Sequence, residues 1–119
     1  MAGAEVVKID APSLHEHTHG GVEVFRLIRP DMYPGVGTCN IAWLKPGQDV
    51  ELHGPHTGDE LFVVFHGETK MEIDGISYFL STNETITVPS GTRHHFINVG
   101  QDTAVFLTLR LQPDEHKTL

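Results

Sequence analysis

Glycine and proline interrupt this chain so often that no long helix is expected to form. The 119 residues include 12 glycines and 7 prolines, many of them in turn-forming pairs such as Pro34-Gly35 and Pro46-Gly47. Both residue types weaken the interior of a helix. No stretch of the length that a packed helix needs keeps helical spacing without meeting one of them. The pattern therefore favours short strands joined by turns.

The segments between these turns are rich in Val, Ile, Phe, Tyr and Thr, which are the residue types that strands prefer. In 105–111 the Val and Leu side chains share one face, and Thr108 and Arg110 share the other, which is the two-residue period of a strand. The predicted strands are 22–29, 38–45, 60–66, 69–74, 76–80, 85–88, 94–99 and 103–111.

Short strands at intervals of roughly ten residues predict an all-β domain, either a β-sandwich or a β-barrel. Asp74-Gly75 lies between two of them and is a strong hairpin signal, because both residues tolerate positive φ. The length fits one domain. We place it at residues 20–111, after a flexible histidine-containing N-terminal segment, 1–19, and before a C-terminal tail, 112–119.

Charge and cysteine content exclude several classes of function. The 16 acidic and 8 basic residues give a net charge of −8, and the basic residues are scattered singly, so we expect neither a nucleic-acid partner nor a membrane surface. The single cysteine, Cys39, allows no internal disulfide. The chain shows no apolar run long enough to cross a bilayer and no signal-peptide pattern, so we expect a cytoplasmic protein.

Histidine is the residue type that points to chemistry. Two of the histidines, His53 and His56, precede the predicted strand that opens with Glu60, and His94 follows the turn Pro89-Ser-Gly91. Imidazole and carboxylate groups that converge from different strands can bind a divalent transition metal. Two histidines and one carboxylate on one side of the ion would leave positions open for a substrate, oxygen or water. The nine histidines are at 15, 17, 19, 53, 56, 66, 94, 95 and 116.

Two segments resemble the conserved motifs of the cupin superfamily. Residues 47–67, GQDVELHGPHTGDELFVVFHG, are similar to the first motif, in which a glycine precedes a histidine pair, a glutamate and a second glycine. Residues 89–98, PSGTRHHFIN, match the second motif, Pro-x-Gly-x-x-His-x-x-x-Asn. The resemblance spans about residues 20–111 and implies a small single-domain cupin of the cupin_2 type, an antiparallel double-stranded β-helix or jelly-roll barrel.

The resemblance also implies a set of metal ligands: His53, His56, Glu60 and His94. The chain departs from the motif at Pro55, where the second histidine of the pair is usual, so His56 reaches the ion only if the chain bulges by one residue. A site of three ligands with His56 at the rim is the alternative. Asn83 stands where the second motif opens with glycine, and asparagine tolerates the same left-handed backbone.

Several other residues admit two roles each. The histidine run 15–19 is read as a solvated segment, with metal capture or a lid as the alternative. His95 should face away from His94, at the surface or a subunit contact. His66 belongs either to the pocket or to the end of its strand. The remaining choices are Asn98 as a turn residue or a partner of the ligands, Cys39 as core or cavity wall, and Arg93 as a turn charge or a substrate contact.

The expected function is a metal-dependent enzyme acting on a small organic molecule. We favour a non-haem dioxygenase-type oxidoreductase, because open positions on the ion could hold substrate and oxygen together. The alternatives are a redox-neutral isomerase, lyase or polyketide-type cyclase, and a non-enzymatic binding or sensor module. The metal could be Fe, Mn, Zn, Ni, Cu or Co, and the catalytic residues are not identified. The apolar positions Leu61, Val63 and Phe65 should face outward and predict a homodimer.

Overall fold

The computed structural model describes residues 3–16, 21–52 and 57–112, and these are almost entirely strands and turns. The helical residues among them form one short 3-10 turn, and no helix in this part of the chain is long and apolar enough to cross a membrane. In chain order the elements are η1 (Pro12–Leu14), β1 (His15–Glu16), β2 (Glu23–Ile28), β3 (Val36–Leu44), β4 (Asp49–Leu52), β5 (Glu60–His66), β6 (Thr69–Ile73), β7 (Ile76–Leu80), β8 (Glu84–Val88), β9 (His94–Asn98) and β10 (Ala104–Leu111).

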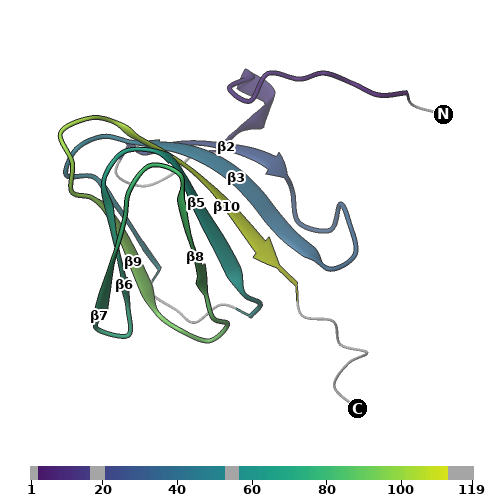
Figure 1. Ribbon diagram of the computed structural model, residues 1–119. Coiled ribbons are helices and arrows are strands. Elements are labelled where there is room, and N and C mark those ends of the chain that lie inside the picture. Colours follow the sequence, from purple (N-terminus) through teal and green to yellow (C-terminus); the bar gives the residue numbers. More distant parts are fainter. Residues whose placement is uncertain (1–2, 17–20, 53–56, 113–119) are drawn as a thin grey trace, which may run out of the picture.

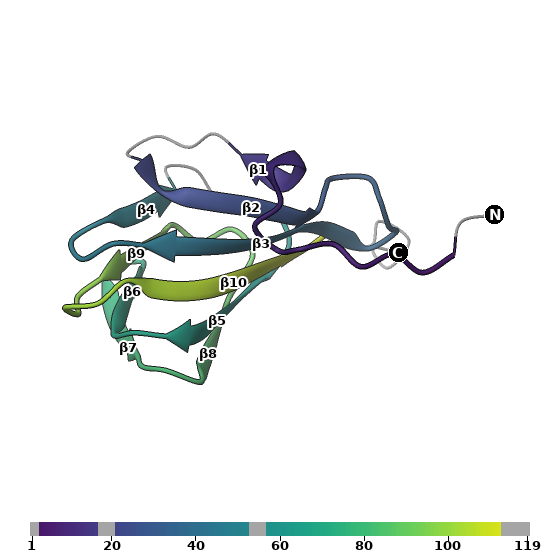
Figure 2. The same ribbon diagram turned by 90° about the horizontal axis from the view of Figure 1, so that it is seen from above.

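The strands form two antiparallel sheets that face each other (Figure 1). The larger sheet has the order β1-β2-β3-β10-β5-β8, and the smaller has the order β4-β9-β6-β7. Seen from above, β2, β3, β10 and β5 of the larger sheet lie side by side (Figure 2). Strands distant in the sequence are therefore neighbours, as in a jelly roll. This confirms the predicted all-β antiparallel fold.

The expected closed barrel is not found. Within the described ranges no ladder of hydrogen bonds joins one sheet to the other, so the molecule is a two-sheet sandwich. The chain passes from β7 in one sheet to β8 in the other through residues 81–83, where Asn83 has a φ of 68°. The turn carries the chain from β7, at the edge of the smaller sheet, to β8, at the edge of the larger sheet. The left-handed backbone at Asn83 is the one that the sequence indicated.

All eight predicted strands are present, with ends that differ by at most two residues. Two strands were not predicted. The sequence of β4 is Asp-Val-Glu-Leu, which lacks a run of strand-forming residues, and β4 forms by pairing with β9. The two-residue β1 pairs with β2 in the same way. In both cases a tertiary partner outweighs local propensity.

The predicted hairpin at Asp74-Gly75 is confirmed, with φ values of 49° and 84°. Its tip is also tied to the start of β9. The backbone N–H of Asp74 donates to the carbonyl oxygen of Arg93 (3.2 Å), and the backbone N–H of Arg93 donates to Oδ1 of Asp74 (3.3 Å). These contacts fix the residue that precedes His94.

The inner face of the larger sheet has an apolar end. The side chains at this end are almost fully buried and pack against Met71 and Phe96 of the smaller sheet. The ring centroids of Phe96 and Phe106 are 4.6 Å apart. Burial of this area from both sheets supplies the main driving force for folding. We define the apolar end as Ala42, Leu44, Val64, Ala104 and Phe106.

The same strands carry polar side chains at the other end of the inner face. Cross-strand partners are Arg26 with Asn40, Asn40 with Thr108, and Arg110 with both Thr38 and Glu60. Because side chains on neighbouring strands project in register, these groups converge on one region between the sheets. We define the polar end as Arg26, Thr38, Asn40, Glu60, Thr108 and Arg110.

Candidate metal centre

Glu60 and His94 meet inside the molecule. Glu60 opens β5 in the larger sheet, and His94 opens β9 in the smaller sheet, so the two side chains approach from opposite walls. Nε2 of His94 lies 3.0 Å from Oε1 of Glu60, and the two side chains are only 3% and 12% exposed. Two of the four ligands implied by the motif resemblance are therefore together.

This donor pair fits a divalent transition metal. Ligand atoms about 2.0–2.2 Å from one ion are themselves roughly 3 Å apart when they occupy neighbouring positions. An imidazole nitrogen and a carboxylate oxygen suit several first-row metals. A carboxylate in a nearly dry site also needs a partner, which here is His94 and would be the ion when one binds.

Two hydrogen bonds between the motif segments position this pair. The backbone N–H of Gly58 donates to Oγ of Ser90 (2.9 Å), and the backbone N–H of Ser90 donates to Oδ1 of Asp59 (2.9 Å). Asp59 directly precedes Glu60, and Ser90 belongs to the turn that precedes His94. The two contacts hold the segment before β5 against the segment before β9.

An aromatic wall borders the site on its apolar side. The ring of Phe62 stands edge-on to the imidazole of His94, with centroids 5.6 Å apart, and packs on Phe96 and Phe106. Glu60, Phe62 and Val64 share the inner face of β5, as the alternation of the sequence predicted. The wall keeps water from reaching the pair through the core.

The predicted ligands His53 and His56 lie outside the described residues. In the described chain, β4 ends at Leu52, and the Cα partner of Leu52 is His94. The pairing of β4 with β9 thus brings the part of the first motif that precedes the histidine pair beside the second motif. His17 and His19 also lie outside the described residues.

A cavity of about 270 Å³ adjoins Glu60 between the sheets. The polar end forms one part of its wall and apolar side chains form the rest. Sequence reasoning did not single out Arg26 and Arg110 as functional residues. The only available signal for Arg110 was its alternation with leucines, which does not say which face is inside. The lining residues are Val24, Arg26, Thr38, Asn40, Ala42, Val50, Glu60, Phe62, Phe106, Thr108 and Arg110.

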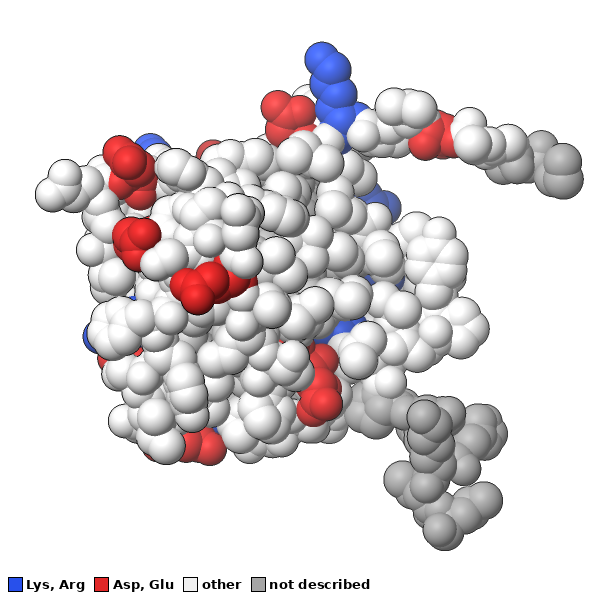
Figure 3. Space-filling model, viewed as in Figure 1, with Lys and Arg blue, Asp and Glu red and all other residues white. Residues whose placement is uncertain are grey.

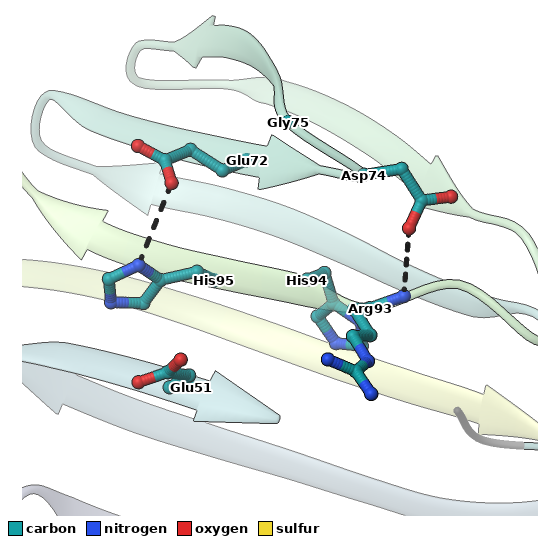
Figure 4. Close-up of a pocket in the computed structure, with 7 residues that line it drawn as sticks. All are labelled: Glu51, Glu72, Asp74, Gly75, Arg93, His94 and His95. Atoms are coloured by element: carbon teal, nitrogen blue, oxygen red, sulfur yellow. Dashed lines mark hydrogen bonds and ion pairs between the residues drawn. The ribbon is translucent and has the colours of Figure 1, made fainter. Parts of the chain in front are cut away.

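His95 faces away from His94, as predicted, and lies in a cluster of carboxylates on the outer face of the smaller sheet. Its Nε2 is 2.6 Å from Oδ2 of Asp49, and its Nδ1 is 3.8 Å from Oε2 of Glu72. Figure 4 shows His95 between Glu51 and Glu72, in a shallow pocket of about 250 Å³. A hydrogen bond and charge from Lys70, with a smaller effect of His95, lower the pKa of Glu72.

This outer cluster is a second place where an ion could bind. One ligand atom from each of Asp49, Glu51 and His95 lies within 4.8 Å of the others. Both carboxylates are exposed, in contrast to the buried pair of Glu60 and His94. The short contact between His95 and Asp49 is also explained by an ion pair. The outer cluster is therefore a control site for experiments on the inner pair.

Three of the other residues with two possible roles occupy positions that fit the structural role. Asn98 is buried, and its side chain binds the carbonyl oxygens of Leu44 and Asp102 and the backbone N–H of Gly100, all at 2.8 Å. These are turn contacts at the opposite end of β9 from His94. His66 is exposed at the end of β5. Cys39 is buried on the outer face of β3, and this burial raises the pKa of its thiol.

Comparison with known proteins agrees with this geometry. The profile of the cupin domain family matches residues 40–110, which include both motifs and most of the inner face. An uncharacterized protein from Methanocaldococcus jannaschii, MJ1618, is 24% identical over 119 residues, covering 98% of this chain and 95% of that protein.

Two further relatives have names that refer to chemistry. The polyketide synthase CurC of Streptomyces cyaneus is 24% identical over 97 residues, which cover 81% of this chain and 63% of that protein. The crystal structure of a predicted oxalate decarboxylase from Thermotoga maritima superposes with a TM-score of 0.71 at 24% identity, covering 77% of this chain and 81% of the other. The superposition shows that the two proteins share a fold.

Proposed function

This chain belongs to the cupin family, and from that premise we propose that it is a metal-dependent enzyme acting on a small organic molecule. The reaction that we favour is a dioxygenase-type oxidation. A bound divalent ion would supply positive charge and open positions where an organic oxygen donor and oxygen can be held together. The fold alone does not select a reaction, so the proposal depends on the site.

The contact between Glu60 and His94 carries this proposal. It joins one residue from each motif, 34 positions apart in the sequence, and both side chains are nearly dry. In the proposed enzyme Glu60 and His94 hold the ion together with His53 and His56. Phe62 excludes water from one side, and the neighbouring cavity of about 270 Å³ receives the substrate.

The first test is the metal content of the purified protein and of two variants on the same strand. We expect close to one equivalent of a transition metal in the wild-type chain and in His95→Ala, and little in His94→Ala. Elemental analysis measures this directly, and the outer histidine serves as the matched control. A wild-type protein with only a small fraction of an equivalent, after growth with added metals, would favour the non-enzymatic binding module instead.

The names of two relatives favour redox-neutral chemistry as a second candidate. Polyketide synthesis and the decarboxylation of oxalate are both reactions without net oxidation of the substrate by oxygen. In that case the ion would act as a Lewis acid in an isomerase, lyase or cyclase. Oxygen uptake by the metal-loaded protein with diketones, phenols and thiols separates the two. Substrate turnover without oxygen uptake supports the second candidate.

A further inference from the structure

We propose that the polar end is a binding subsite for the carboxylate group of a small organic anion, and that Arg26 and Arg110 are the residues that bind it. The proposal deepens the proposed function, since it names the class of substrate for the cavity beside Glu60. It is carried by the placement of the two arginines and by the features that hold them there.

Both arginines line the cavity from the larger sheet. Arg26 lies on β2 and Arg110 on β10, with β3 between the two strands. Arg110 is the Cα partner of Glu60, so its side chain projects from the row that contains the proposed metal ligand. A molecule bound by the guanidinium groups would therefore lie beside the metal centre.

Arg26 is oriented by a neighbour on the next strand. Its Nε donates to Oδ1 of Asn40 at 3.1 Å, and the same Nε lies 4.0 Å from Oε1 of Glu16, at the limit of an ion pair. The two terminal nitrogens take part in neither contact. A guanidinium held through Nε presents its other edge as a fork, the geometry that binds carboxylates with two hydrogen bonds.

Arg110 is accommodated by a glycine on β3. Gly37 is buried, and a Cβ atom there would lie 3.1 Å from Nε of Arg110 and 3.0 Å from its carbonyl oxygen. The register between β10 and β3 shifts at this point, between Arg110 and Leu111. The φ of Gly37 is not left-handed, so the position needs glycine for space rather than for backbone freedom. Any larger residue would press on Arg110.

Two arginines in one cavity are unusual for a chain with so few basic residues. The protein has a net charge of −8 and only four arginines, and two of them line one cavity. On the face shown in Figure 3, acidic side chains are scattered singly over the surface. The other two arginines, Arg29 and Arg93, are exposed.

The lining also sets the size and shape of the ligand. The volume of about 270 Å³ is smaller than the roughly 300–1,000 Å³ of pockets for drug-sized ligands. Thr38 and Thr108 offer hydroxyl groups beside the arginines, while Val24, Phe62 and Phe106 make the remaining wall apolar. We therefore infer a compact organic acid, with its carboxylate at the arginines and its less polar part against the aromatic wall.

The test compares malonate with malonamide, its uncharged diamide of similar shape. Two-dimensional NMR titration of the full-length protein, as purified and after removal of metal by chelation, gives the dissociation constant of each probe. We expect binding of malonate and not of malonamide in both preparations. Arg26→Gln and Arg110→Gln should each weaken malonate binding by about tenfold or more. Arg29→Gln is the matched exposed control and should change nothing.

Gly37→Ala tests the same idea without removing a charge, and it keeps the proposal testable if Arg110→Gln fails to fold. It should weaken malonate binding because Arg110 must move. Malonate binding that is unaffected by both arginine variants, equal binding of the two probes, or no malonate binding would each overturn the subsite. The chelated preparation tests the subsite without an ion. If the protein as purified, after growth with added metals, holds no metal and still binds malonate through the arginines, the subsite stands and the proposed metal-dependent enzyme does not.

Discussion

The apolar end and the polar end of the larger sheet lie on the same strands and on the same face, yet they have opposite character. On β10, Phe106 belongs to one and Arg110 to the other, four residues further along the strand. The alternation of a strand decides which residues point inward, but not whether the interior is dry and packed at that point. Position along the strand separates the part that stabilises the fold from the part that binds.

The two ends also differ in what they contribute to stability. The apolar end has little exposed surface and complete packing partners in the smaller sheet. The polar end borders a cavity, so its side chains forgo part of the packing that a filled core would give them. Polar groups in such a place are retained for binding, at a cost to the free energy of folding.

The largest effect should come from a truncation at the apolar end. We expect Phe106→Ala to lower the free energy of unfolding by about 3–5 kcal/mol, because it leaves a cavity beside Phe62 and Phe96. Thr108→Val, two residues along the same strand, should change it by less than about 1 kcal/mol. Urea denaturation followed by circular dichroism measures both. Equal losses would show that the two ends are one packed core.

A charge removed at the polar end should affect metal binding more than stability. Glu60→Gln keeps the shape of the side chain but not the charge, and we expect metal affinity to fall by at least about 100-fold, beyond the loss typical of groups that only support a ligand. Glu51→Gln in the outer cluster is the control. Competition with a chromophoric chelator gives both affinities. If the control loses metal and Glu60→Gln does not, the ion binds outside.

The outer face of the larger sheet extends the comparison, because on β5 it is apolar behind both ends. Leu61, Val63 and Phe65 alternate with the inward residues of β5, and Phe65 is 44% exposed. We propose that a second copy of the chain covers this face, as the sequence predicted. Phe65→Asp should then weaken self-association about tenfold or more, as measured by sizing with light scattering.

The matched control for self-association is Phe79→Asp. Phe79 is also an exposed phenylalanine, at 71%, but it lies on β7 at the edge of the smaller sheet. It should leave the oligomeric state unchanged. A wild-type chain that elutes as a monomer at high concentration would contradict the homodimer outright, and dissociation by both variants would show that the interface is elsewhere.

The smallest effect concerns Cys39, on the same outer face. Burial raises the pKa of its thiol, so less of the reactive thiolate is present at pH 8 than in an unfolded chain. Alkylation by iodoacetamide should therefore be slow in the folded protein, should speed up as the pH rises, and should reach the rate of a free cysteine in urea. Mass spectrometry follows the reaction. Rapid labelling of the folded protein at pH 7 would contradict the burial.

The strands, the hairpin at Asp74-Gly75 and the meeting of Glu60 with His94 could be predicted from the sequence, because each leaves a local pattern or a motif. β4 could not, since its pairing with β9 is a tertiary event. Arg26 and Arg110 could not either. The leucines that alternate with Arg110 look like the core face in isolation, and only the position of the second sheet shows that they point outward.

Asn98 adds a constraint on how any ligand moves. Its three hydrogen bonds secure the end of β9 to the loop after it and to the end of β3, beyond the buried Leu44 and Ala104. Among the described residues that end of the sandwich is filled by buried side chains, and the cavity lies at the other end, among the arginines. We therefore expect substrate and product to enter and leave on the arginine side. A product would have to leave before fresh substrate entered, and product inhibition should be competitive.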